Sequence, residues 1–260
     1  LNNYLSTKKL INKIKPCAIF HLASNADVRL SFDKPRDIIN NNNNITLNLL
    51  ETIRKSKTNP VILICSTSEV YGTVKKKDTP IGEKNMINPA SPYAVSKTFQ
   101  DLLSQTYYKN FNLRVIITRM FSYFNSRRNN LFSSNWAKQI AEIEKGKRKI
   151  LKHGNLNSIR TIIGINDAME AYWKAATLGK IGEIYNIGGG KTIKIEKILN
   201  LLIKMSNCKI KTVTDKKLLR KTDVTLQIPN CSKFKRHCKW EPKENFETSM
   251  KILLEDFRKQ

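Results

Sequence analysis

The sequence predicts an α/β fold built on a doubly wound parallel sheet, with a smaller interleaved α/β domain. Short β-branched runs alternate with longer amphipathic segments, which is typical of β–α–β units. Three of these runs end in polar residues, which read HLASNA, STSEVYG and RMFSYFNSRR. Because ligands of open α/β sheets bind beyond the carboxyl ends of the strands, we expect the chemistry at that edge.

The regular elements follow from apolar runs and helical periodicity. Four apolar runs are predicted as buried parallel strands, at residues 17–23, 61–67, 113–121 and 182–189. Helical spacing predicts helices at about 4–15, 35–56, 91–110, 132–146 and 166–178. The run Asn40–Asn44 lies in the second of these helices, because the apolar residues on both sides of it keep helical spacing.

The domain organisation follows from where this alternation breaks. The 260 residues, 40% of them hydrophobic, suit one large domain or two small ones with a real core. Shorter strands and helices are expected in 123–159 and 191–260, and we predict that these form a substrate domain. Residues 1–122 and about 160–190 are predicted to form the sheet domain.

The charge balance is strongly basic and bears on possible partners. The net charge is +26, from 47 Lys+Arg against 21 Asp+Glu, which favours anionic partners and invites a nucleic-acid hypothesis. The lysines are nevertheless scattered, and only Lys75–Lys77 form a tight run. We interpret the excess mainly as a solvated surface, with a few arginines for a ligand's phosphates, and predict no nucleic-acid partner.

The cysteines and the hydropathy indicate a compartment. Five cysteines without a C-x-x-C pair favour reduced thiols in a cytosolic protein. Cys231, His237 and Cys238 lack a partner pair at ligand spacing, so no metal site is predicted. There is no run of 18 apolar residues and no signal-peptide pattern. We therefore expect a cytoplasmic protein without a membrane partner.

The stretch NPASPYAVSK at 88–97 places Tyr93 and Lys97 one turn apart at a predicted helix start, where both side chains reach a common point. A nearby cation stabilises a phenolate, so this pair can move a proton near neutral pH. Taken alone, the stretch also fits a helix start with a packed tyrosine and a solvated lysine.

Several motifs occur in one order along nearly the whole chain: HLASNA, STSEVYG, SPYAVSK, RMFSYFNSRR, HGNLNSIRT, INDAMEAYWKA, GEIYNIGGGKTIKI and the segment ending in HCKWEP. Together they resemble the extended short-chain dehydrogenase/reductases, the NAD-dependent epimerase/dehydratase family, and most closely its GDP-mannose 4,6-dehydratases. The resemblance implies a Rossmann-like cofactor domain, NADP or NAD as cofactor, and a nucleotide sugar, such as a GDP-hexose, as substrate. It also implies a homodimer or homotetramer formed through the helices at 35–56 and 91–110.

In this family a strand, a glycine fingerprint and a further strand precede the segment that resembles the start of this chain. The first glycine here is Gly72. The resemblance therefore implies that on the order of 60 residues, about two β–α units, precede Leu1 in the complete protein. We expect that the fragment alone can be inactive. The residue that separates NAD from NADP would lie in that part.

The resemblance also assigns catalytic roles. Tyr93 would take the proton from the sugar's O4 while a hydride leaves C4, and Thr67 would share the proton path. Lys97 would lower the tyrosine's pKa and bind the cofactor ribose. Glu69 would remove the C5 proton before water leaves C6, a step that a plain reductase or epimerase does not need. The expected reaction is that of a nucleotide-sugar 4,6-dehydratase, converting GDP-mannose to GDP-4-keto-6-deoxymannose.

The binding residues come from the same matches. Those expected along the cofactor are Leu22, Ala23, Ser24, Asn25, Ala26, Tyr93, Lys97 and Arg128. Those expected on the nucleotide sugar are Ser68, Asn155, Arg160 and Arg220. Departures from the family pattern weaken the prediction of GDP-mannose as substrate more than the prediction of a nucleotide sugar in general. They include Thr161 after Arg160, Lys221 after Arg220, Ser122 and Ser126. A related reductase, epimerase or decarboxylase, and a catalytically silent basic binding protein, remain as alternatives.

Overall fold

The fold is centred on a four-stranded parallel sheet in the order β1-β2-β3-β7. A computed structural model describes residues 1–219 and 224–260. The strands are β1 (Ala18–His21), β2 (Val61–Thr67), β3 (Val115–Met120) and β7 (Ile184–Ile187). All four predicted strands are confirmed, and their order with parallel pairing confirms the doubly wound sheet.

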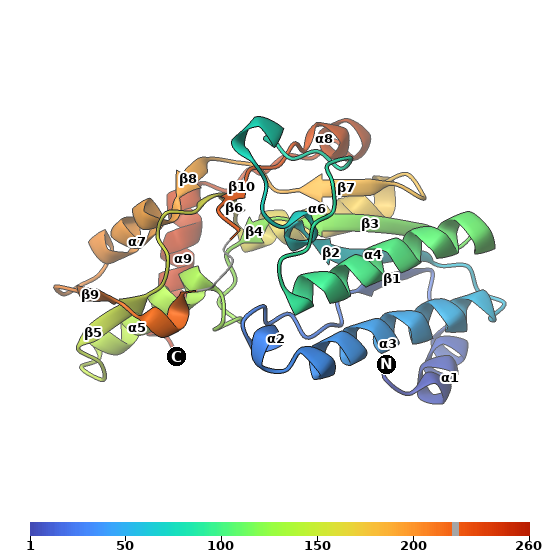
Figure 1. The fold of residues 1–260 in the computed structure, drawn as a ribbon, viewed down its shortest axis with the longest axis horizontal. Coiled ribbons are helices and arrows are strands. Elements are labelled where there is room, and N and C mark those ends of the chain that lie inside the picture. The colour runs from blue at the N-terminus through green and yellow to red at the C-terminus, as the bar shows by residue number, and fades with distance from the viewer. Residues whose placement is uncertain (220–223) are drawn as a thin grey trace.

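Helices cover both faces of this sheet (Figure 1). On β2, Ile62 and Ile64 pack with α1, α3 and α4, whereas Leu63 and Cys65 pack with α6 and α8. Successive strand side chains point to opposite faces, so burial on both faces requires the continuous apolar run that the sequence shows. The covering helices are α1 (Tyr4–Ile14), α3 (Pro35–Arg54), α4 (Pro92–Phe111), α6 (Ile165–Leu178) and α8 (Ser232–Cys238).

A second group of elements lies beside the carboxyl ends of the sheet (Figure 1). Its core includes Trp136, Ile140, Leu199 and Leu254 from α5, α7 and α9. β6 pairs with β4, β10 and β8, and β5 pairs with β9. The elements are β4 (Ser122–Tyr123), α5 (Phe132–Glu144), β5 (Ile150–His153), β6 (Ile159–Ile163), β8 (Thr192–Lys194), α7 (Ile195–Lys204), β9 (Lys211–Thr214), β10 (Leu226–Gln227) and α9 (Phe246–Arg258).

The predicted helices are confirmed, with α5 matching the one expected at 132–146 and the asparagine run lying inside α3. The predicted domain boundaries stay a prediction. Two packing relations bear on them: α8 packs on α6 and β7 of the main sheet, and β6 pairs within the smaller sheet. Segments from either side of the predicted division are therefore interleaved.

Local sequence features define where α4 begins and where β2 ends, at the carboxyl ends of the main sheet. The Ser91 hydroxyl accepts a hydrogen bond from the backbone N–H of Ala94 at 3.1 Å, and Pro92 follows at the first helical position. After β2 the chain turns through a short 3₁₀ helix and leaves it at Gly72. Gly72 has φ of 59°, and a Cβ there would lie 1.7 Å from the carbonyl oxygen of Asn88, so only glycine fits.

Within the ranges 1–219 and 224–260, no helix combines the length and apolar character needed to cross a bilayer. The five cysteines carry free thiols. Among the same residues, no group of three or more His, Cys, Asp or Glu side chains is arranged to hold a metal ion.

Candidate active site

A cavity of about 660 Å³ lies where the carboxyl ends of β1, β2 and β3 meet the second group of elements. Leu22, Thr67 and Met120 line it from the sheet side, and Trp136 and Ile195 line it from the opposite side. This is the edge at which the polar strand ends predict chemistry. The volume lies within the range of small-molecule and cofactor sites.

Most of the predicted site residues meet in this cavity, although their roles stay predictions. Those that line it are Leu22, Ser24, Ala26, Thr67, Ser68, Glu69, Tyr93, Lys97, Arg128, Asn155 and Arg160. Ala23 and Asn25 are not among its lining residues. Arg220 lies outside the described residues.

Tyr93 and Glu69 both line this cavity. Burial raises the pKa of the Tyr93 phenol well above its ordinary value, and the charge of the Glu69 carboxylate raises it further. The Arg128 guanidinium and a hydrogen bond with the Thr67 side chain act in the opposite direction. A phenol, a hydroxyl and a carboxylate therefore line one cavity.

Lys97 lies one turn further along α4 and is buried, with 4% of its surface exposed. Its ammonium donates a hydrogen bond to the backbone carbonyl of Cys65 at 2.5 Å. Burial lowers the pKa of Lys97 to about 8. Lys97 thus ties the start of α4 to the end of β2, and its expected effect on the Tyr93 phenol stays a prediction.

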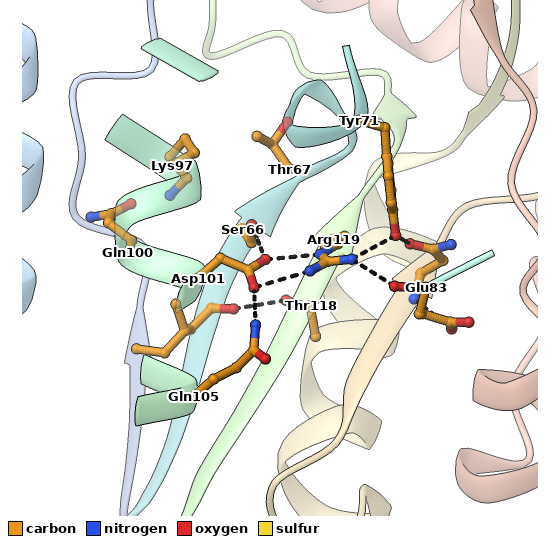
Figure 2. A network of polar contacts seen from close by, with 12 residues as sticks. Ser66, Thr67, Tyr71, Glu83, Lys97, Gln100, Asp101, Gln105, Thr118 and Arg119 are labelled. Carbon is orange, nitrogen blue, oxygen red and sulfur yellow. Dashed lines mark hydrogen bonds and ion pairs between the residues drawn. The ribbon is translucent and has the colours of Figure 1, made fainter. Parts of the chain in front are cut away.

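A buried ion pair beneath the cavity holds these elements in place (Figure 2). Asp101 follows Lys97 by one turn on α4, and Arg119 lies on β3. Arg119 Nε and Nη2 donate to the two carboxylate oxygens of Asp101 at 2.8 and 3.1 Å. Ser66, which precedes Thr67 on β2, donates to the same carboxylate at 2.9 Å. The pair therefore ties β2, which ends at Thr67, and α4, which carries Tyr93 and Lys97, to the neighbouring strand β3.

Arg119 extends this network to the loop after β2 and to β7. Its Nη1 donates to the Tyr71 hydroxyl and to the backbone carbonyl of Glu83, both at 3.0 Å. Tyr71 in turn donates to Asn186 at 2.7 Å. The sequence contained a signal of this network, since Arg119 is a charged residue in a strand that is otherwise uncharged.

The segment 22–26, which is expected to run along the cofactor, is held by hydrogen bonds from two sides. Asn42 of α3 accepts from the backbone N–H of Asn25 at 2.7 Å and donates to its carbonyl at 3.0 Å. Arg128 donates to the carbonyl of Ala26 at 2.7 Å. With the small side chains of Ser24 and Ala26 on the cavity, the backbone is open to close approach, which fits a dinucleotide. Asn42 was missed in sequence because it lies within the asparagine run.

Glu69 has a partner that the sequence did not reveal. Gln227 of β10 donates from Nε2 to Glu69 Oε1 at 3.0 Å, and its own oxygen accepts from Arg160 Nη1. Arg160 Nη2 also donates to the carbonyl of Val224 at 3.1 Å. Gln227 lies within the last of the matched segments, but the resemblance assigned it no role. The site thus combines a buried phenol, a hydroxyl and a held carboxylate, a set able to move protons at two neighbouring carbons.

Comparisons with known proteins relate this chain to nucleotide-sugar enzymes. Residues 1–253 match the model of the family described as GDP-mannose 4,6 dehydratase. The chain is 26% identical to the GDP-6-deoxy-D-mannose reductase of Pseudomonas aeruginosa over 244 residues, covering 93% of this chain and 80% of that protein. It is 30% identical to a UDP-glucuronate 4-epimerase of Thermodesulfobacterium geofontis over 255 residues, covering 96% and 75%.

Among solved structures, RMD from Pseudomonas aeruginosa complexed with NADPH superposes with a TM-score of 0.91 at 25% identity. The similarity covers 99% of this chain and 86% of that one.

Proposed function

This chain belongs to the GDP-mannose 4,6-dehydratase family of NAD-dependent epimerases and dehydratases, and from that premise we propose that it acts as a nucleotide-sugar 4,6-dehydratase. One observation carries the proposal: the Glu69 carboxylate lies in the same cavity as Tyr93 and Thr67 and acts on the Tyr93 phenol. A reductase or a 4-epimerase works at C4 alone, whereas a 4,6-dehydratase also needs a base for the C5 proton.

The cofactor proposed is NADP or NAD, held by the backbone at 22–26, by Lys97 and by Arg128. A similar protein in the family was solved with NADPH, which supports this choice. When bound, the cofactor would supply the hydride chemistry, in which a hydride leaves C4 and returns at C6. Lys97, with a pKa of about 8, can donate hydrogen bonds to a ribose near neutral pH.

The proton steps belong to this chain's residues. In its phenolate form, Tyr93 takes the proton of the sugar's O4 with Thr67 on the same path, as C4 becomes a carbonyl. That carbonyl acidifies the hydrogen on C5, and Glu69 accepts it. The C6–oxygen bond then breaks and a C5–C6 double bond forms. The leaving hydroxide takes up one of the two protons that Tyr93 and Glu69 have accepted, and it departs as water. Proton return to C5 completes the balance.

The substrate proposed is a GDP-hexose, GDP-mannose in the first place. The family model supports this choice. Arg160 and Asn155 line the cavity on the side expected to hold the nucleotide diphosphate, where a guanidinium can bind oxygens in pairs. Arg220 is proposed as a further contact from the sequence alone.

We also propose a cytoplasmic homodimer. The free thiols fit a reducing compartment. α3 and α4 lie side by side on one face of the sheet (Figure 1). Their outer surface exposes large apolar side chains, namely Leu47, Val95, Phe99, Leu102 and Phe111. A second copy of the same pair would cover this surface by two-fold symmetry.

Glu69→Gln in the purified protein tests the assignment, with GDP-mannose as substrate. In deuterated water the wild type should form the 4-keto-6-deoxy product with deuterium at C5. Glu69→Gln should stop after the first oxidation and show the absorbance of reduced nicotinamide, because C5 keeps its proton. Glu196→Gln is the control, since Glu196 lies on α7 without lining the cavity and forms an ion pair only with Lys194 among the described residues.

Three outcomes would count against the assignment: no 4-keto product from the wild type, normal turnover by Glu69→Gln, or loss of carbon dioxide from a uronic-acid substrate instead. Consumption of reduced cofactor in proportion to product would indicate a reductase.

A further inference from the structure

We propose that Gln227 is a positioning residue that holds Glu69 for the C5 proton and links it to Arg160. The inference rests on the proposed function, because it gives Glu69 its role in elimination. Gln227 is 2% exposed and lies on β10, which pairs with β6 so that Gln227 faces Arg160 in register. It is separated from Glu69 by 158 positions, and only the fold brings the two together.

The neighbours of Gln227 permit a single orientation of its amide. Arg160 can only donate a hydrogen bond, so it must meet the amide oxygen. An ionised carboxylate can only accept, so Glu69 must meet the amide nitrogen, at 3.0 Å. The amide therefore bridges Glu69 and Arg160 in one orientation only. In the reversed orientation its nitrogen would face the donors of Arg160, and its oxygen would face the acceptor of Glu69.

This bridge has two consequences for the carboxylate. It occupies Oε1 of Glu69, so Oε2 is the oxygen left for the C5 proton. It also stops the side chain from rotating away, and a base placed even slightly off its target loses much of its rate. Because the Arg160 guanidinium binds the amide oxygen of Gln227, it polarises the amide N–H group that donates a hydrogen bond to Glu69.

Two substitutions separate the two ends of the bridge. Gln227→Glu keeps the shape and an acceptor for Arg160, but it replaces the donor to Glu69 with a second carboxylate. Gln227→Met keeps the approximate length and loses both contacts. Losing a hydrogen bond to a charged group corresponds to about a 10- to 100-fold change in rate. We expect elimination to slow by that factor in Gln227→Met and by more in Gln227→Glu.

The experiment follows single turnover with GDP-mannose, alongside calorimetric binding of GDP. Both variants should accumulate reduced nicotinamide, as Glu69→Gln does, which a general loss of structure would not produce. In the Glu69→Gln background, where elimination is already blocked, neither substitution should change the rate at which reduced nicotinamide forms. Gln227→Glu should keep GDP affinity within a few-fold, whereas Gln227→Met should weaken it. Gln139→Met is the matched control, because Gln139 is equally buried and hydrogen-bonded but does not line the cavity.

The inference is overturned if either Gln227 variant eliminates at the wild-type rate, or if a Gln227 substitution slows the first oxidation in the Glu69→Gln background. A folded Gln227→Met protein that loses oxidation and elimination equally also overturns it. A wild type that forms no 4-keto product overturns the proposed function first, so the two failures are told apart by the wild-type reaction alone.

Discussion

Replacing Arg119 by methionine removes the positive half of an ion pair whose side chains are 2% and 0% exposed. Arg119 makes four hydrogen bonds to described partners, two to Asp101, one to Tyr71 and one to the Glu83 carbonyl. Breaking a buried pair costs about 3–5 kcal/mol, because one charge is left without its partner. Ser66 and Gln105 still donate to Asp101, so we expect the lower end, about 3 kcal/mol.

In a protein of this size that loss corresponds to a fall in the unfolding midpoint of roughly 6–12 °C. Thermal unfolding by circular dichroism measures it, and Arg148→Met is the control. Arg148 bonds Glu142 at the same 2.8 Å, but both side chains are about a third exposed, so at most about 1 kcal/mol is expected there. Distance is thereby matched and burial is varied.

The double variant Asp101→Leu with Arg119→Met should be more stable than either single variant, because it leaves neither charge buried alone. Equal midpoints for Arg119→Met and Arg148→Met would refute the reasoning. So would a double variant less stable than both singles, since the cost would then come from lost packing and not from an unpaired charge.

The remaining predictions concern the phenol, the assembly and acid stability. Tyr93→Phe should abolish turnover and leave nucleotide-sugar binding by calorimetry nearly intact, and retention of more than about a tenth of the activity contradicts its role. The wild type should sediment as a dimer at micromolar concentration and Leu102→Asp as a monomer, because Leu102 is 48% exposed on α4; a monomeric wild type contradicts the proposed interface. Burial lowers the pKa of His21 from 6.5 to about 3. Between these two pH values the unfolded chain binds more protons than the folded chain, so the folding stability should fall as the pH drops from 6.5 towards 3. His21→Asn should show a smaller fall in unfolding midpoint from pH 6.5 downward, and an identical profile would contradict a neutral buried imidazole.

The local elements of this protein could be predicted from its sequence, because each depends on neighbours along the chain. The apolar run at 61–67 is continuous since both faces of β2 are buried, and the start of α4 is encoded in Ser91 and Pro92. The spacing of Tyr93 and Lys97 puts them on one helix face, and the polar strand ends mark the edge where the cavity lies.

The tertiary structure decided which polar atoms meet. Lys97 bonds the carbonyl of Cys65, an outcome of how α4 packs on β2 and not of its spacing from Tyr93. Asn42 looks like one of five asparagines until the fold sets it against Asn25. Gln227 and Glu69 are 158 positions apart, and no periodicity relates them. Periodicity records burial residue by residue, whereas a hydrogen bond between distant segments depends on the register and packing of whole elements, which only the folded chain specifies.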